Sequence, residues 1–197
     1  MKEKEIRQLI TEKIEVRAAT ESQKKTIGGY AVRYNSPTLM NDRWGDKFLE
    51  EVSAGAFDKS LLTRTQKALW NHESCMPLGS VAANTLRFNQ DITGLNYDID
   101  LPNNSYGNDA FESVSRGDVD GSSFGFICVN DIWSVIQHEG EEIYKRSIVE
   151  AELFEVSPCT FPAYESSEMS CRSLETYKED INKQEELRMR LIILSLF

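Results

Sequence analysis

Few side chains in this 197-residue chain can support acyl transfer, because it contains only two histidines, His72 and His138. A serine hydrolase needs a base that accepts a proton near neutral pH, and histidine, with an unperturbed pKa of about 6.5, is the usual choice. His138 lies in a polar Gln-His-Glu-Gly-Glu-Glu segment and is predicted to be a solvated turn residue. His72 follows an apolar strand segment and is a candidate base, although a purely structural histidine explains this local sequence equally well.

A pair of serines between two glycines supplies the candidate nucleophile. In residues 121–126 (Gly-Ser-Ser-Phe-Gly-Phe), strand alternation puts both aromatic rings on one face and Ser123 and Gly125 on the other. The rings can then anchor the strand while Ser123 faces a cleft. Glycine lets a substrate backbone come close and frees amide donors for an oxyanion. A strand that merely starts after a glycine-rich turn is the alternative explanation.

Glu155 is the candidate for the third member of a catalytic triad. It interrupts the apolar run of residues 153–156, where a carboxylate has to pair or hydrogen-bond because a lone buried charge is costly. Pairing with a histidine would fix the tautomer of the ring and stabilise its protonated form. A strand residue that faces solvent, like Glu150 and Glu152 before it, is the alternative.

The four cysteines, Cys75, Cys128, Cys159 and Cys171, include no Cys-x-x-Cys pair, and we expect them to be buried or free thiols. His72 and Cys75 have a zinc-like spacing, but no second pair of ligands completes such a site. Neither Cys75 nor Cys159 has a glycine-rich or helix N-terminal setting that would activate it as a nucleophile. We therefore expect no metal and no cofactor.

Composition and charge limit the partners. The chain carries 22 basic and 32 acidic residues, a net charge of -10, so a nucleic-acid backbone is a poor partner. Residues 1–17 lack the apolar segment of a signal peptide, and the late apolar run of residues 191–197 is far shorter than the roughly 20 residues that cross a membrane. We expect a cytosolic protein with no membrane partner.

The elements expected to position these side chains are mostly strands. A short helix is predicted to open at Ser53, a second helix to run over residues 105–116 and stop at Gly117, and a turn to lie at residues 77–79. Alternating and β-branched residues predict strands at residues 26–34, 48–52, 67–71, 81–89, 94–101, 122–137 and 142–155.

This order of elements favours a mostly β fold (α+β), a closed or nearly closed antiparallel β-barrel with peripheral helices. Strands and helices do not alternate regularly, which argues against a doubly wound parallel sheet. We expect three parts: residues 1–13 form an arm, frayed or with a short helix, residues 14–165 form the β-barrel domain, and residues 166–197 form a charged tail with a helix over about residues 174–194.

Taken together, the segments resemble the prohead maturation proteases of tailed bacteriophages, a family distantly similar to the herpesvirus assemblins. Each segment is weak alone, but their common order and spacing over about residues 15–165 are specific. The segments are residues 28–32 (GGYAV), 51–57 (EVSAGAF), 69–73 (LWNHE) with 77–79 (PLG), 121–126 (GSSFGF), and 153–157 (LFEVS) with 161–163 (FPA).

The resemblance implies a barrel of the herpesvirus-protease type and a serine endopeptidase without a cofactor. The family's histidine falls on His72 and its serine on Ser123, but Ser122 stands where the family often has an apolar residue, which leaves a choice between two adjacent hydroxyls. Related proteases use either a second histidine or an acid as third member. Because His138 is expected in a hairpin tip, Glu155 is the predicted one.

The resemblance also implies the substrates and the location. The enzyme would cut scaffold protein, or the scaffold-like arm of the capsid protein, and itself, inside the assembling prohead in the bacterial cytoplasm; a homo-oligomer is left open. Two other functions stay open here: a non-enzymatic scaffolding or capsid-assembly protein, and a cytosolic hydrolase with an unrelated substrate. A scaffold would need neither His72 nor Ser123 and is expected to be mostly helical.

Overall fold

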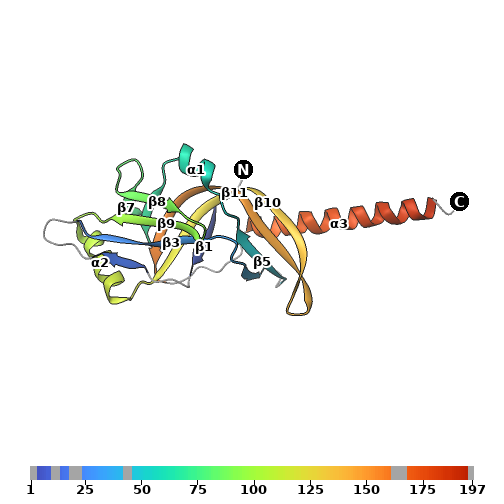
Figure 1. The fold of residues 1–197 in the computed structure, drawn as a ribbon, viewed down its shortest axis with the longest axis horizontal. Coiled ribbons are helices and arrows are strands. Elements are labelled where there is room, and N and C mark those ends of the chain that lie inside the picture. Colours follow the sequence, from blue (N-terminus) through green and yellow to red (C-terminus); the bar gives the residue numbers. More distant parts are fainter. Residues whose placement is uncertain (1–3, 10–13, 18–23, 42–45, 161–167, 195–197) are drawn as a thin grey trace.

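Two β-sheets form the body of the protein, and a long helix projects from it (Figure 1). The structure, a computed structural model, describes residues 4–9, 14–17, 24–41, 46–160 and 168–194. Within these residues the first sheet contains β1 (Glu5–Leu9), β4 (Thr38–Asn41), β5 (Lys47–Val52), β6 (Lys67–Trp70), β7 (Glu73–Ser80), β10 (Gly121–His138) and β11 (Glu141–Cys159). The second contains β2 (Glu15–Arg17), β3 (Thr26–Arg33), β8 (Leu86–Gln90) and β9 (Gly94–Asp100). The helices are α1 (Asp58–Thr63), α2 (Ser105–Arg116) and α3 (Glu168–Leu194).

The long antiparallel hairpin of β10 and β11 is the centre of the first sheet. Its pairing runs from Gly121 opposite Cys159 to His138 opposite Glu141. The outer edge of β11 pairs in parallel with β5 along the first half of β11 and with β6 near the end of β11. The outer edge of β10 pairs with β1. Three strands from other parts of the sequence, β1, β5 and β6, therefore pair with this hairpin.

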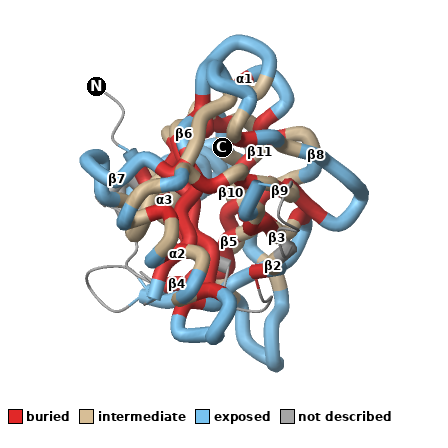
Figure 2. Tube along the Cα trace, turned by 90° about the vertical axis from the view of Figure 1, so that its left-hand side faces the viewer, coloured by how far each residue is buried: buried red, intermediate tan, exposed pale blue. Residues whose placement is uncertain are grey.

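The hydrophobic core lies between the two sheets. Phe124 and Phe126 of β10 stack on each other with ring centroids 5.3 Å apart, and both meet the edge of Phe57. Tyr97 and Ile99 of β9 face them from the second sheet. Figure 2 shows buried residues running through β10, β11 and β5, with exposed residues in the surrounding loops. The predicted alternation is confirmed, because the phenylalanines face the core.

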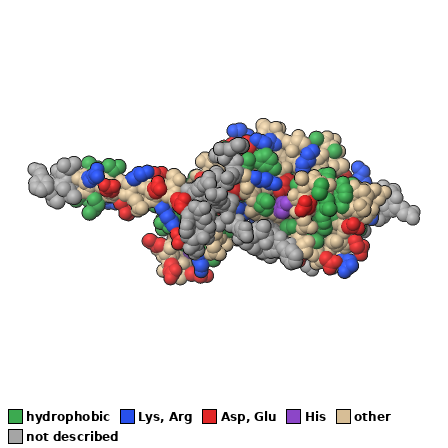
Figure 3. Space-filling model, turned by 180° about the vertical axis from the view of Figure 1, so that it is seen from behind, with side chains coloured by type: hydrophobic (Ala, Val, Ile, Leu, Met, Phe, Trp, Pro, Cys, Tyr) green, Lys and Arg blue, Asp and Glu red, His purple; other side chains and the backbone are tan. Residues whose placement is uncertain are grey.

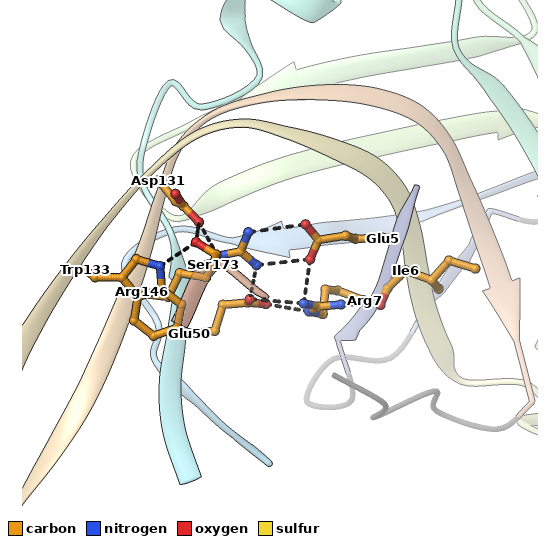
Figure 4. A network of polar contacts seen from close by, with 8 residues as sticks. All are labelled: Glu5, Ile6, Arg7, Glu50, Asp131, Trp133, Arg146 and Ser173. Carbon is orange, nitrogen blue, oxygen red and sulfur yellow. Dashed lines mark hydrogen bonds and ion pairs between the residues drawn. The ribbon is translucent and has the colours of Figure 1, made fainter. Parts of the chain in front are cut away.

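A cluster of buried charges ties β1 to the rest of the first sheet (Figure 4). Arg146 of β11 is 1% exposed and donates to Glu5 of β1 at 3.0 Å and to Glu50 of β5 at 2.8 Å. Arg7 of β1 donates to the same two carboxylates, at 2.9 and 3.0 Å. Each buried charge thus has an opposite charge and a hydrogen bond, which is the condition for keeping ions in a low-dielectric interior.

The first turns of α3 pack against the body. Leu174 is buried with Met40 and Phe48, and the ring of Tyr177 stacks on that of Trp133, with centroids 6.2 Å apart. The predicted tail helix is confirmed, but it begins earlier, at Glu168, and its start belongs to the body.

The far end of α3 points away from the body and carries hydrophobic side chains (green in Figure 3). The exposed hydrophobic residues at this end are Leu187, Met189, Leu191 and Ile192. No helix in the described ranges combines the length and the apolar character that a membrane span requires.

The structure corrects the prediction for the N-terminal residues. Instead of a frayed arm or a short helix, Glu5–Leu9 form the strand β1. The sequence was misleading because Glu5 and Arg7 look like surface charges, whereas their alternation places both in the interior against Arg146 and Glu50.

Three further expectations change. Residues 77–79 lie inside β7 and are not a turn, and α1 begins at Asp58 because residues 53–57 are taken up by tight turns. The sheet is not purely antiparallel, since the chain crosses over to bring β5 and β6 in parallel onto β11. An isolated β-bridge between Tyr34 and Val52 links the two sheets. Among the described residues neither sheet closes into a barrel, so the predicted barrel is not confirmed.

Glu50 makes the stability of this sheet pH-dependent. Burial alone would raise the pKa of Glu50, but the charges of Arg7 and Arg146 and their hydrogen bonds lower it to about 2. Because this pKa lies below the unfolded value of about 4.3, the carboxylate stabilises the fold fully above that value, and the contribution is lost as the pH falls toward 2. Urea denaturation of wild type and of Glu50→Gln gives the difference between their free energies of unfolding. We expect this difference to become smaller by roughly 3 kcal/mol when the pH is lowered from about 5 to about 2.

The matched control is Glu150→Gln, which removes a half-exposed carboxylate that pairs with Lys59 on the surface. Its difference from wild type should change little with pH, because a solvated pair of this kind contributes little to stability. An equal pH dependence for the two variants would contradict the buried-pair explanation.

Candidate active site

His72 sits in a strained turn between β6 and β7. Trp70 and Glu73 pair across the hairpin, which leaves Asn71 and His72 as a two-residue loop with φ angles of 49° and 64°. Two-residue loops with both φ angles positive favour asparagine followed by glycine, and a side chain at the second position costs on the order of 1 kcal/mol. A histidine therefore stands where the backbone prefers glycine.

Backbone contacts with the end of β11 hold this turn in place. Asn71 donates from its backbone N–H to the carbonyl oxygen of Pro158 at 3.1 Å, and its side-chain oxygen accepts from the N–H of Thr160 at 3.0 Å. The turn is thus fixed on β11 at the point where the candidate acid lies.

The imidazole of His72 is hydrogen-bonded to Glu155, as expected for a base and its orienting acid. Nδ1 of His72 lies 2.8 Å from Oε1 of Glu155, whose side chain is 3% exposed. Burial tends to raise the pKa of Glu155, but the hydrogen bond with His72 and the charges of His72 and Lys4 lower it below its usual value. Ionised Glu155 accepts a hydrogen bond from Nδ1–H, and in this tautomer of the neutral ring Nε2 is the hydrogen-bond acceptor.

A bulge in β11 aims Glu155 at this site. Gly125 pairs with Glu155 and Phe126 pairs with Leu153, so Phe154 is an extra residue on the β11 side. Leu153 and Val156 both lie in the core, which means that regular alternation would have turned Glu155 inward with Leu153. The extra residue puts the carboxylate on the opposite face, as bulges beside functional sites often do.

Ser157 belongs to the site and was missed in the sequence analysis. Its hydroxyl donates to Oε2 of Glu155 at 2.8 Å and accepts from the backbone N–H of His72 at 3.2 Å. The signal was present, because residues two apart on a strand share a face and Glu155 had already been singled out.

Ser123 lies on this face of the sheet, and its neighbour Ser122 does not. Ser123 is directly opposite Ser157, whereas the Ser122 hydroxyl points into the core and lies 2.7 Å from the hydroxyl of Tyr97. Within the described residues no hydrogen bond joins Ser123 to His72. The Ser123 hydroxyl is instead fully buried and donates to the carbonyl oxygen of Arg7 at 2.8 Å.

Gly125 makes room for the carboxylate. A Cβ atom at this position would overlap the ends of the Glu155 and Lys4 side chains. Lys4 itself places its ammonium group 3.0 Å from Oε1 of Glu155, the oxygen that His72 uses. The space that we expected for a substrate backbone is therefore occupied by these two side chains.

An open groove that Glu155 helps to line lies beside the hairpin of β6 and β7. Its walls are largely apolar, and they include Leu69, Pro77, Leu101 and Phe154. The surface in Figure 3 carries a histidine side chain with hydrophobic and acidic groups around it. A groove of this kind can hold apolar side chains of a peptide close to the His72–Glu155 pair.

The other candidates lie elsewhere. His138 is exposed at the hairpin tip, next to Glu139 and Gly140 with their positive φ angles, at the opposite end of β10 from Ser123. Cys75 is exposed, whereas Cys128 and Cys159 are buried. The side chain of Cys171 and residues 161–163 lie outside the part that the structure describes.

The strain at His72 gives a stability prediction that is independent of activity. His72→Gly and His72→Ala lose the same contact with Glu155, but only glycine relieves the positive φ angle. We expect His72→Gly to be more stable than His72→Ala by about 1 kcal/mol in urea denaturation. At the neighbouring Glu73, which lies in a regular strand, the order should be reversed. Alanine being the more stable replacement at both positions would contradict the strained-turn explanation.

Comparison with known proteins gives one finding. The sequence model of a family described as "Caudovirus prohead serine protease" matches residues 12–180, which is most of the chain. No curated protein and no solved structure gives a significant match. The matched range contains His72, Ser123, Glu155 and Ser157.

Proposed function

The chain belongs to the caudovirus prohead serine protease family, a family of serine peptidases of phage maturation, and we propose that Ser123, His72 and Glu155 are its catalytic residues. The observation that carries this proposal is the 2.8 Å contact between His72 and Glu155 on the strand face that also holds Ser123. Nucleophile, base and orienting acid are the three parts that such a mechanism needs.

In the proposed reaction His72 accepts the Ser123 proton through Nε2 as Oγ forms a bond to the scissile carbonyl carbon. Glu155 holds the ring by Nδ1 and stabilises the imidazolium. His72 then passes the proton to the leaving amine as the C–N bond breaks, and a water molecule, activated in the same way, releases the acyl group from Ser123. Ser157 is a positioning residue, because its hydroxyl fixes the second oxygen of Glu155.

We propose as substrates the scaffold protein or the scaffold-like arm of the capsid protein, together with the protease itself, cleaved within the assembling prohead in the host cell. Family membership supports a capsid or scaffold substrate. The strand-rich body with a histidine–carboxylate pair favours this enzyme over a purely structural scaffold.

Ser123→Ala tests the nucleophile. Removal of one triad member can reduce turnover on the order of a millionfold, so we expect no processing of a co-expressed capsid or scaffold partner in mass spectrometry. Ser122→Ala is the matched control: it should process normally and lose about 1 kcal/mol of stability with its hydrogen bond to Tyr97. Normal processing by Ser123→Ala would refute the assignment, and loss only in Ser122→Ala would move it by one residue.

Glu155→Gln tests the acid. The amide keeps the shape of the side chain but favours the wrong tautomer of His72, so we expect processing to fall by roughly a thousandfold or more, and by less than in Ser123→Ala. His138→Ala should process at the wild-type rate, because this ring lies at the hairpin tip. An inactive but folded His138→Ala would favour a second-histidine triad and remove Glu155 from the role.

A further inference from the structure

The strand β1 covers the edge of β10 that carries Ser123. The two strands are antiparallel, with Gln8 opposite Ser123 and Ile6 opposite Gly125. β1 is the outermost strand of its sheet, so its removal would leave the backbone groups of β10 unpaired beside the candidate nucleophile. An unpaired edge of this kind is a binding site for an extended peptide, which adds to the sheet as a further strand.

Two contacts from β1 and the residue before it engage the proposed catalytic groups. The Ser123 hydroxyl donates to the backbone carbonyl of Arg7. The ammonium group of Lys4 donates to Oε1 of Glu155, the same oxygen that contacts Nδ1 of His72. A hydroxyl held by a main-chain carbonyl is not available to His72. These contacts therefore keep the proposed nucleophile away from its base.

Buried ion pairs hold β1 in this position. Arg7 and Glu5 reach into the interior, where they meet Glu50 and Arg146. Because Glu50 and Arg146 also pair directly with each other at 2.8 Å, they keep a partner when β1 leaves. β1 takes out one positive and one negative charge together, so its release does not change the net charge of the cluster.

On the basis of the proposed function, we propose that β1 is an inhibitory strand that occupies the peptide-binding edge of β10. The protease is blocked while β1 is paired, and a substrate peptide takes its place when it is displaced. Displacement frees the Ser123 hydroxyl to donate to His72 and frees Glu155 from Lys4. The site thus recognises an extended peptide through backbone hydrogen bonds, and the chain supplies the first such peptide itself.

The test compares full-length proteins by the rate at which a small fluorophosphonate labels Ser123. Arg7→Glu places a negative charge against Glu5 and Glu50, which should drive β1 from the sheet, and we expect labelling at least about tenfold faster than in wild type. Arg7→Lys, which keeps the charge, should label at close to the wild-type rate. Ile6→Gly weakens the strand without touching the ion pairs, and it should also label faster. This second variant carries the test if Arg7→Glu does not fold.

A peptide with the sequence of residues 1–12 provides the complementary measurement. It should slow the labelling of Arg7→Glu and have little effect on wild type, where the edge is already filled, while a scrambled peptide of the same composition should slow neither. Equal labelling of wild type, Arg7→Glu and Ile6→Gly would overturn the inhibition and leave the protease assignment intact. Absence of labelling in every folded variant would overturn the protease assignment and the inhibition with it.

Discussion

The antiparallel pairing of β10 with β11 aligns Ser123 with Ser157 and Gly125 with Glu155, and every other part of the site is arranged around that register. Side chains alternate between the faces of a sheet, so a slip of one residue would put the serine and the carboxylate on opposite sides. The stacked Phe124 and Phe126 oppose such a slip, because it would turn their rings out of the core. The same packing that stabilises the fold thus fixes the positions of Ser123 and Glu155 relative to each other.

Two local departures from regular structure are concentrated at this point. The extra residue at Phe154 turns Glu155 out of the core, and the positive φ angle of His72 aims its ring at that carboxylate. Each is unfavourable by itself, and each persists because neighbouring contacts fix it: the strand pairing for the bulge, and the contacts of Asn71 for the turn. Departures of this kind are expected where function and local preference conflict.

The long strands β3, β9, β10 and β11 could be predicted because they follow local alternation, whereas β7 was taken for a turn at residues 77–79. Ser123 and Glu155 became candidates by local rules as well. Alternation gave the face of Ser123, and the isolated carboxylate in an apolar run gave Glu155. The strand β1 was missed because charged residues normally indicate a surface, and the burial of Glu5 and Arg7 depends on Glu50 and Arg146, which are far away in the sequence. The bulge at Phe154 could not be predicted either, since it depends on the register between β10 and β11. Parallel pairing of β5 and β6 with β11 is equally non-local.

The helix α3 gives the molecule a mechanical property that the compact body alone lacks. With 27 residues it is about 40 Å long, and only its first turns rest on the body. A continuous helix acts as a stiff spacer, whereas the end-to-end distance of a disordered linker with the same number of residues would vary widely. A molecule bound to the exposed apolar end of α3 would therefore be held at a fixed distance from the body of the protein. The body could then contact only peptides that lie at about this distance from the molecule bound to the helix. The spacing between neighbouring copies of that molecule would therefore decide which peptides can be contacted.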